Sequence, residues 1–190
     1  MKCLLCDSLS FSHICNACQE ENLQASLYTR KILNDIKVYS FYKYHDIEVL
    51  LHTKHTDLGA YIYKILAEKA FVPFAQAFDF DGEVVSLSVD DHVKQGYSHT
   101  AILNQGLKSS VIQPLYGRLR AQSSDTYSGK DFQYRLLHPR RFTYKVFQGE
   151  DVIVVDDIIT TGLTLTQAVE CLIAEGKNVL FCLTLADAKV

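Results

Sequence analysis

A short run of residues towards the C-terminal end of the chain combines acids, hydroxyls and a glycine in a pattern that could bind a phosphorylated sugar. The run is VIVVDDIITTGLT, residues 152–164, and its four β-branched residues are typical of a buried parallel strand. Asp156 and Asp157 follow at the expected carboxyl end of that strand, where open α/β sheets bind ligands. Carboxylates at this position suit sugar hydroxyls, or a magnesium ion that bridges a diphosphate.

The turn after the two acids predicts a phosphate site at the start of a helix. The N–H groups of residues 158–162 would face the helix N-terminus, whose partial positive charge favours phosphate. Gly162 lets the backbone approach closely, and threonine hydroxyls add donors. An ordinary strand–turn–helix junction with a threonine cap is the alternative. Gly176 marks the expected end of the helix, whose apolar face would consist of Leu165, Ala168, Val169, Leu172 and Ile173.

Four of the six cysteines lie in the first 18 residues, as two Cys-x-x-Cys pairs. Each pair can supply two thiolates from one tight turn, and two turns can close a tetrahedron around zinc. A head this short cannot build a core of its own, so metal ligation would stabilise its fold. Two disulfides or four free thiols are the alternatives. The predicted ligands of a structural Zn²⁺ are Cys3, Cys6, Cys15 and Cys18.

Length and composition favour an ordinary globular protein with one core and a small appendage. The chain has 190 residues, of which 48% are hydrophobic and 22% are charged. We expect a cytoplasmic protein with reduced thiols, because the sequence shows neither a signal-peptide core nor a membrane-length apolar run. The net charge of −3 gives no support for nucleic-acid binding by the chain as a whole.

Strands that alternate with helices predict an α/β sheet. Residues 1–22 would form the cysteine head, and residues 38–190 would form one continuous domain. Residues 23–37 would form a linker helix between them, because the stretch from Glu20 to Asp35 has the pattern of an amphipathic helix. The other expected elements are strands at 38–44, 84–89, near 111 and at 178–186, with helices at 46–52 and 58–71.

Residues 116–147 differ in charge from the rest of the chain. They carry seven Lys and Arg residues against two Asp residues, with aromatic residues interleaved. Single-strand binders use this mixture, because cations follow the phosphates while rings stack on bases. A solvated loop whose aromatics pack on the sheet, or a set of cations that holds a pyrophosphate facing the acids, would give the same pattern. The predicted DNA-binding residues are Lys94, Arg118, Arg120, Lys130, Arg135, Arg140 and Arg141.

The pattern at 152–164 resembles the phosphoribosyl pyrophosphate motif of type I phosphoribosyltransferases. The resemblance implies a parallel sheet flanked by helices, and a site for phosphoribosyl pyrophosphate with Mg²⁺. It assigns the two acids, Asp156 and Asp157, to the ribose hydroxyls. It assigns to the 5′-phosphate Ile158, Ile159, Thr160, Thr161, Gly162 and Thr164.

A four-cysteine head joined to such a body resembles, over nearly the full length, the ComF family of bacterial competence proteins, and within it those of the Helicobacter–Campylobacter group. The stretch KQGYSH at 94–99 corresponds to that family's Arg-Gly-Phe-Asn-Gln motif, with Gln95 in place of the arginine and Ser98 and His99 in place of the amide pair.

The ComF resemblance implies a factor in DNA uptake and natural transformation that handles incoming single-stranded DNA at the inner face of the inner membrane. Its partners would be a competence helicase and the inner-membrane DNA channel. An active phosphoribosyltransferase of nucleotide metabolism is the alternative, and a ligand sensor or a relic site that serves partner docking is a third.

Overall fold

The computed structural model describes residues 1–89, 96–121 and 142–190. Within these ranges the strands form a six-stranded sheet in the order β1-β2-β8-β7-β3-β4 and a separate β5-β6 pair. Strand β1 is antiparallel to β2, whereas every other neighbouring pair in the large sheet is parallel. The strands are β1 (Tyr28–Ile32), β2 (Ile36–Lys43), β3 (Val84–Ser88), β4 (Ile112–Leu115), β5 (Leu119–Ala121), β6 (Phe142–Tyr144), β7 (Asp151–Ile159) and β8 (Asn178–Asp187).

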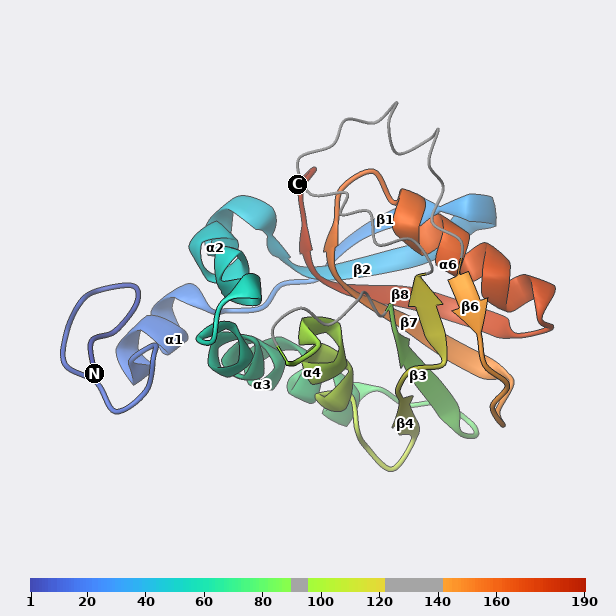
Figure 1. Cartoon of the computed structure of the whole chain (residues 1–190), viewed down its shortest axis with the longest axis horizontal. Coiled ribbons are helices and arrows are strands. Elements are labelled where there is room, and N and C mark those ends of the chain that lie inside the picture. The colour runs from blue at the N-terminus through green and yellow to red at the C-terminus, as the bar shows by residue number, and fades with distance from the viewer. Residues whose placement is uncertain (90–95, 122–141) are drawn as a thin grey trace.

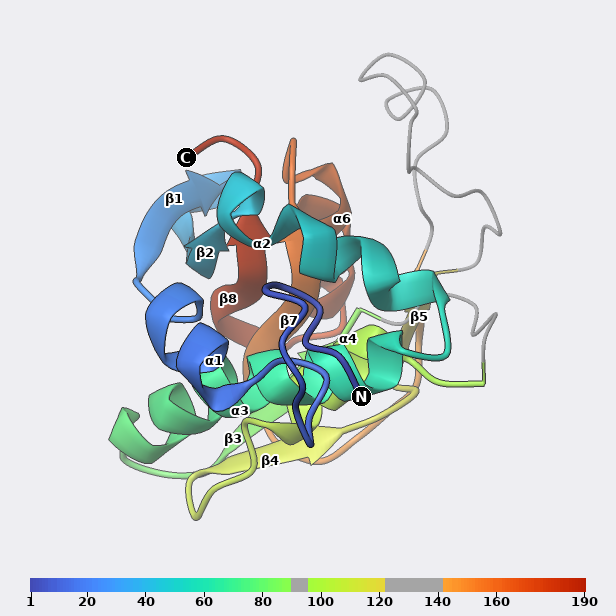
Figure 2. The same cartoon turned by 90° about the vertical axis from the view of Figure 1, so that its left-hand side faces the viewer.

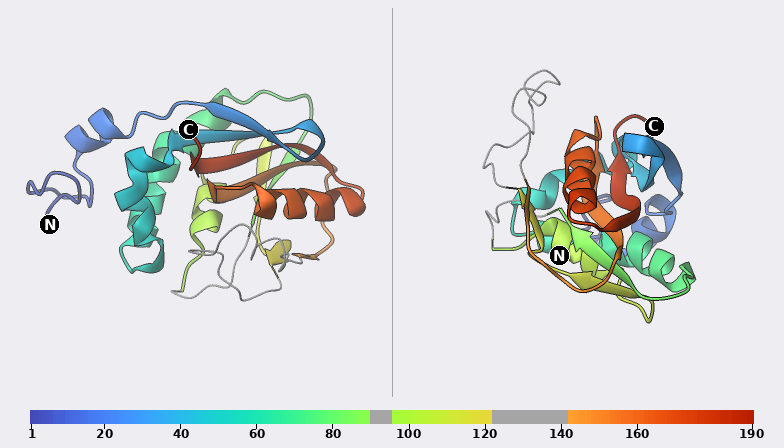
Figure 3. Two further views of the ribbon diagram at one scale, coloured as in Figure 1. Left: turned by 90° about the horizontal axis from the view of Figure 1, so that it is seen from above. Right: turned by 90° about the vertical axis from the view of Figure 1, so that its right-hand side faces the viewer.

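Helices cover both faces of the large sheet (Figures 1 and 3). Alternate residues of β7 face opposite sides, as the pleat of a strand requires. Ile153 and Val155 join the core beneath the helices of one face, while Val152 and Val154 join the core beneath α6 on the other. The helices are α1 (Asn16–Asn22), α2 (Tyr44–Leu51), α3 (Gly59–Ala77), α4 (His99–Gln105) and α6 (Leu163–Ala174).

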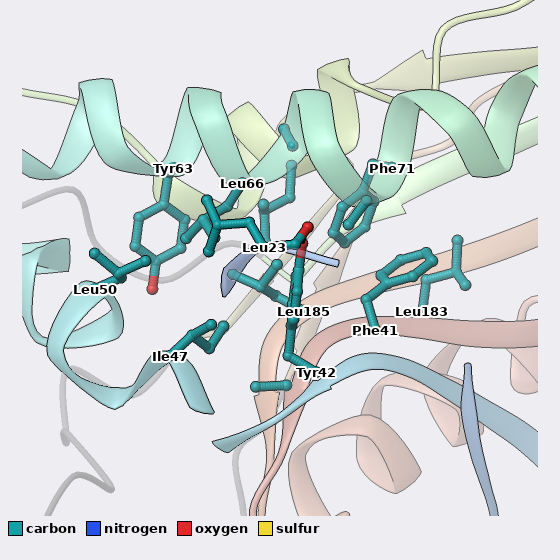
Figure 4. Close-up of a cluster of buried hydrophobic side chains, with 14 of the residues drawn as sticks. Leu23, Phe41, Tyr42, Ile47, Leu50, Tyr63, Leu66, Phe71, Leu183 and Leu185 are labelled. Carbon is teal, nitrogen blue, oxygen red and sulfur yellow. Dashed lines mark hydrogen bonds between the residues drawn. The ribbon is translucent and has the colours of Figure 1, made fainter. Parts of the chain in front are cut away.

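The larger core lies between α3 and the sheet (Figure 4). Tyr63, Leu66 and Phe71 project from α3 towards Phe41 of β2 and Leu185 of β8, and all five side chains are at most 4% exposed. Such burial of apolar surface is the main stabilising term in a domain of this size. It fixes α3 across the sheet, so residues on α3 keep a constant position relative to the strand ends.

The predicted α/β class, a mostly parallel sheet flanked by helices, is confirmed. The short helix α4 was not predicted, because its sequence follows no clear apolar period. The strand expected near residue 111 is β4, and Pro114 lies inside it. β4 is an edge strand, and an edge strand tolerates proline because one side of its backbone needs no partner.

The predicted helix over residues 20–35, with its linker part at 23–37, is wrong. Helix α1 ends at Asn22, and residues 28–32 form the edge strand β1. Tyr28, Arg30 and Ile32 are partly buried while the residues between them are exposed, so the true period is two. A three-residue connection, 33–35, with Asp35 at φ +70° then turns the chain into β2. Leu23, Leu27 and Ile32 lie four and five positions apart, and this spacing imitated a helical period.

The cysteine head lies at one end of the molecule (Figures 1 and 2). It consists of a loop, in which the backbones of Lys2 and Leu9 pair as an antiparallel β-bridge, followed by α1. The His13 ring packs against Tyr61 of α3, with 4.9 Å between ring centroids. Among the residues that the structure describes, no helix is both long enough and apolar enough to cross a membrane.

Candidate functional site

The predicted acids lie at the carboxyl edge of the parallel sheet, but inside strand β7 instead of just beyond it. β7 continues to Ile159 because β8 pairs with it along its whole length, with Asp156 opposite Thr184. Asp156 and Asp157 are 9% and 7% exposed. Buried carboxylates need specific partners, so their surroundings show what each can do.

Asp156 faces the turn that connects β7 to α6. Its side chain lines a small hollow of about 20 Å³, and its Oδ1 accepts the N–H of Asp157 at 2.8 Å. The structure therefore brings Asp156 together with the predicted phosphate turn. The remaining residues around this hollow are Ile158, Ile159, Thr160, Thr161, Gly162, Leu163, Thr164 and Leu165.

The turn itself has the geometry of an anion-binding loop. Gly162 precedes the helix at φ +85°, and a Cβ there would lie 2.9 Å from Ile32. Only glycine suits this position. Since glycine has no side chain to cap the helix, the N–H groups of Thr164 and Leu165 have no side-chain acceptor at residue 162. Leu163 donates to the Thr161 hydroxyl at 3.3 Å. The first turn of α6 thus presents donors and its positive dipole end to the hollow.

Most of the predicted apolar face of α6 is confirmed. Leu165, Ala168, Val169 and Leu172 are at most 1% exposed. Ile173 is 47% exposed, contrary to prediction, because it lies at the edge of the stripe in the last turn of the helix. Gly176 ends the helical segment at φ +76°, as expected. Burial of this face holds the first turn of α6 against the sheet.

Asp157 is held on the other side of the sheet by three side chains that the sequence did not single out as its partners. Its Oδ2 lies 3.0 Å from Lys54 Nζ, 3.3 Å from His99 Nε2 and 3.4 Å from the Tyr63 hydroxyl. Its Oδ1 accepts the N–H of Ile158 at 2.8 Å. Burial raises the pKa of a carboxyl group, but Lys54 and His99 outweigh this effect and hold the pKa of Asp157 well below its usual value.

These partners come from three separate segments: Lys54 from the 3₁₀ turn after α2, Tyr63 from α3 and His99 from the start of α4. The Tyr97 hydroxyl donates to the carbonyl of Lys54 at 2.7 Å, which fixes the backbone that carries the lysine. No local spacing links such distant positions. The sequence offered one signal, the unusual KQGYSH stretch that contains His99.

The phosphoribosyl transferase domain family matches residues 86–189. The chain belongs to this family. The match runs from inside β3 to just past the end of β8, so it contains both acids, the turn and α6. It does not contain the cysteine head, β1 or Lys54.

Parts of the chain are also similar to individual proteins. The chain is 44% identical to the orotate phosphoribosyltransferase of Bartonella henselae over 48 residues, which are 25% of this chain and 24% of that protein. A hypoxanthine phosphoribosyltransferase structure from Staphylococcus aureus has a TM-score of 0.44 at 15% identity, covering 67% of this chain and 64% of that one. A hypoxanthine-guanine phosphoribosyltransferase from Bacillus anthracis has a TM-score of 0.41 at 22% identity, covering 66% of each chain. The chain thus spans about a quarter of that curated relative and just under two thirds of these two structures.

The four N-terminal cysteines converge beside the phosphoribosyl transferase domain. The sulfur atoms of Cys3, Cys6, Cys15 and Cys18 all lie within 4.8 Å of one another, so they could hold a metal ion. Cys6 and Cys15 are 3.7 Å apart, close to the roughly 3.8 Å that tetrahedral bonds of about 2.3 Å to zinc would give. All six cysteines are free thiols, which excludes the alternative of two disulfides in this structure.

A backbone donor stabilises the thiolate of Cys3 in this cluster. The N–H of Cys15 donates to Cys3 Sγ at 3.3 Å, and this bond is the main reason why the pKa of Cys3 falls to about 6. The N–H of Cys18 likewise donates to Cys15 Sγ. The pKa of Cys18 is raised by its contacts with the sulfurs of Cys6 and Cys15. Four crowded sulfurs resist full ionisation, and a bound cation would relieve that repulsion.

Only two of the seven predicted DNA-binding residues lie in the described part of the chain. Arg118 donates to the carbonyl of Val146 at 3.1 Å, and Arg120 is exposed on β5. Among the aromatic residues of this segment, Phe147 is buried and Phe142 and Tyr144 pack against the core beneath α6. Tyr116 is 44% exposed. The residues outside the described ranges are Lys94, Lys130, Arg135, Arg140 and Arg141.

Proposed function

We propose that the turn between β7 and α6 binds the phosphate of a phosphorylated ribose such as phosphoribosyl pyrophosphate. The observation that carries the proposal is one hollow lined by both a buried carboxylate, Asp156, and the first turn of a helix whose N-cap residue, Gly162, has no side chain. The helix end favours the anion, and the carboxylate accepts hydrogen bonds from sugar hydroxyls. The predicted phosphate residues, from Ile158 to Gly162 together with Thr164, all line this hollow.

The two acids take different parts in this proposal. Asp156 accepts from the ribose, whereas Asp157 secures Lys54 and His99 at the same edge of the sheet and reaches the sugar only if it exchanges one of those partners. Mg²⁺ would come with phosphoribosyl pyrophosphate, because diphosphate oxygens are the hard ligands that this ion prefers.

We propose that the head, residues 1–22, binds a structural Zn²⁺ through its four cysteines. Four thiolates complete a tetrahedral shell and leave no open position for chemistry. Metal analysis of the purified protein tests this assignment directly, with one zinc per chain as the expected result. A protein that folds fully with no bound metal would contradict it.

We propose that the whole chain is a ComF-type DNA uptake factor that handles incoming single-stranded DNA in the cytoplasm, at the inner face of the inner membrane. The four-cysteine head joined to a phosphoribosyl transferase domain supports this proposal, as does the basic segment that begins with Arg118 and Arg120. A competence helicase and the inner-membrane DNA channel are the proposed partners.

An active phosphoribosyltransferase of nucleotide metabolism is the second candidate. It is favoured by the match to an orotate phosphoribosyltransferase at 44% identity over 48 residues. Release of pyrophosphate from phosphoribosyl pyrophosphate with a panel of nucleobases decides between the candidates. Turnover with any base supports the transferase, and its absence across the panel, with ligand binding intact, supports the DNA uptake role.

Calorimetric titration with phosphoribosyl pyrophosphate and Mg²⁺ tests the site itself. Wild-type protein should bind, and Asp156→Asn should bind at least about tenfold more weakly, because the lost charge-assisted hydrogen bonds are worth over 1 kcal/mol. Asp151→Asn is the matched control, since Asp151 lies at the opposite end of the same strand and bonds to Asn178. Equal affinity of wild type and Asp156→Asn would overturn the assignment of Asp156.

A further inference from the structure

The edge strand β1 touches the phosphate turn at two points. Arg30 Nη2 donates to the carbonyl oxygen of Thr160 at 2.7 Å. Two residues further along the strand, Ile32 packs closely on Gly162: a Cβ added to Gly162 would lie 2.9 Å from the Cγ2 methyl group of Ile32. β1 lies outside residues 86–189, the part of the chain that matches the family.

The bond from Arg30 sets the direction of the next amide. The carbonyl of Thr160 and the N–H of Thr161 belong to one peptide unit, and in a planar trans peptide these two groups point in opposite directions. No described residue forms a cis peptide bond. A carbonyl drawn towards Arg30 on one side therefore directs the N–H of Thr161 to the other side, away from β1.

Arg30 also forms an ion pair with Asp187 of β8. Its Nε lies 3.2 Å from Oδ2 of Asp187, which is 1% exposed at the end of β8. Nε and the carboxylate form an ion pair without a hydrogen bond, while Nη2 donates to the carbonyl of Thr160, so the planar guanidinium group bridges the two. The chain from Asp187 through Arg30 to Thr160 thus joins the sheet to the turn.

We propose that Arg30 is a positioning residue for phosphate binding: it orients the Thr160–Thr161 peptide so that the N–H of Thr161 faces the anion. The inference rests on the proposed function of the same turn and adds a specific device to it. Arg30 acts through the backbone, and its effect concerns the phosphate group of the ligand more than the sugar.

The test compares the affinities of ribose 5-phosphate and of ribose for four proteins: wild type, Arg30→Met, Arg30→Lys and Lys31→Met. Arg30→Met should bind ribose 5-phosphate about tenfold to a hundredfold more weakly, since a charge-assisted hydrogen bond and the amide it orients are both lost. Lys31→Met removes an equal charge from the next residue of the strand, whose partner is Asp35, and should change the affinity by less than about twofold.

Arg30→Lys separates geometry from charge. A lysine keeps the charge but has a single ammonium group in place of the fork, so it should remain several-fold weaker than wild type. Full affinity in Arg30→Lys would show that charge alone matters and would overturn the positioning role. In ¹⁵N-labelled protein, the amide signal of Thr161 should move in Arg30→Met and stay in place in Lys31→Met.

The outcomes distinguish this inference from the proposed function. If wild type fails to bind ribose 5-phosphate, the proposed function itself fails. If wild type binds and Arg30→Met binds equally well, the site stands and the positioning role is wrong. Should Arg30→Met fold poorly because Asp187 loses its partner, the double variant Arg30→Met with Asp187→Asn removes the unpaired carboxylate and is expected to show the same weak binding of ribose 5-phosphate.

Discussion

Asp156 and Asp157 are neighbours of the same type on one strand, yet their surroundings differ completely. Asp156 faces a small hollow that is lined by the turn after β7 and the first turn of α6. Asp157 faces two basic side chains and a tyrosine hydroxyl on the other side of the sheet. The alternation of a β-strand is enough to cause this division.

The difference teaches that one acidic pair can combine binding and anchoring. Asp157 connects the turn after α2, helix α3 and the start of α4 to the end of β7. These segments lie on the face of the sheet opposite to α6. Asp156 lies beside the small hollow at the start of α6. We therefore expect substitutions of Asp157 to act mainly on folding, and those of Asp156 mainly on binding.

The largest expected effect is the loss of stability in Asp157→Ala. This change leaves Lys54 and His99 without their buried partner, which costs about 3 kcal/mol of unfolding free energy. Urea denaturation followed by circular dichroism measures the change. Asp151→Ala, at the exposed end of the same strand, is the control and should cost less than about 1 kcal/mol. An equal cost for both would show that the Asp157 cluster is no anchor.

Asp156→Asn should show the reverse balance. Its side-chain oxygen can still accept the N–H of Asp157, so the unfolding free energy should change by less than about 1 kcal/mol. Ligand affinity should nevertheless fall at least about tenfold, since the negative charge towards the sugar hydroxyls is lost. A variant that loses stability without losing affinity would reverse the roles proposed for the two acids.

The difference in pH dependence of stability between wild type and Asp157→Asn should report on Asp157. Its folded-state pKa is depressed, so its contribution is fully present above its unfolded pKa of about 4 and is lost as pH falls through the lower folded value. Urea midpoints of wild type should therefore fall as pH is lowered below about 4, more steeply than those of Asp157→Asn. Parallel curves for the two proteins would show that Lys54 and His99 do not hold this carboxyl group ionised.

The smallest expected effects concern binding of single-stranded DNA by Arg118 and Arg120, which take no part in the contacts of Asp157. Arg118→Ala and Arg120→Ala should each weaken binding of single-stranded DNA and reduce the slope of log K against log salt by about one. Fluorescence anisotropy with a labelled oligonucleotide measures both quantities. Lys31→Ala, on the edge strand β1, is the control and should leave them unchanged. DNA affinity that is independent of salt would contradict an electrostatic interface.

Local patterns in the sequence were sufficient to predict the sheet, the turn and α6. Four β-branched residues in a row indicated the strand, a glycine indicated a turn with positive φ, and an apolar stripe at helical spacing indicated the helix. The cysteine pairs were equally informative, because their spacing alone brings four sulfurs together.

Long-range partners could not be predicted in this way. The bond from Lys54 to Asp157 spans 103 positions and that from Arg30 to Thr160 spans 130, and no period in a sequence encodes such pairs. The error at 28–32 had a related origin, since β1 exists through its pairing with β2. Apolar spacing alone favoured a helix there, and the tertiary contact decided otherwise.

The most direct test of the account is an amide chemical-shift titration of ¹⁵N-labelled protein with ribose 5-phosphate, and with ribose in parallel. If the phosphate binds at the N-terminal end of α6, the largest amide shifts should occur at residues 161–165, and they should occur with ribose 5-phosphate but not with ribose. Shifts confined to other parts of the chain, or equal shifts with both sugars, would contradict the claim that this turn receives the phosphate.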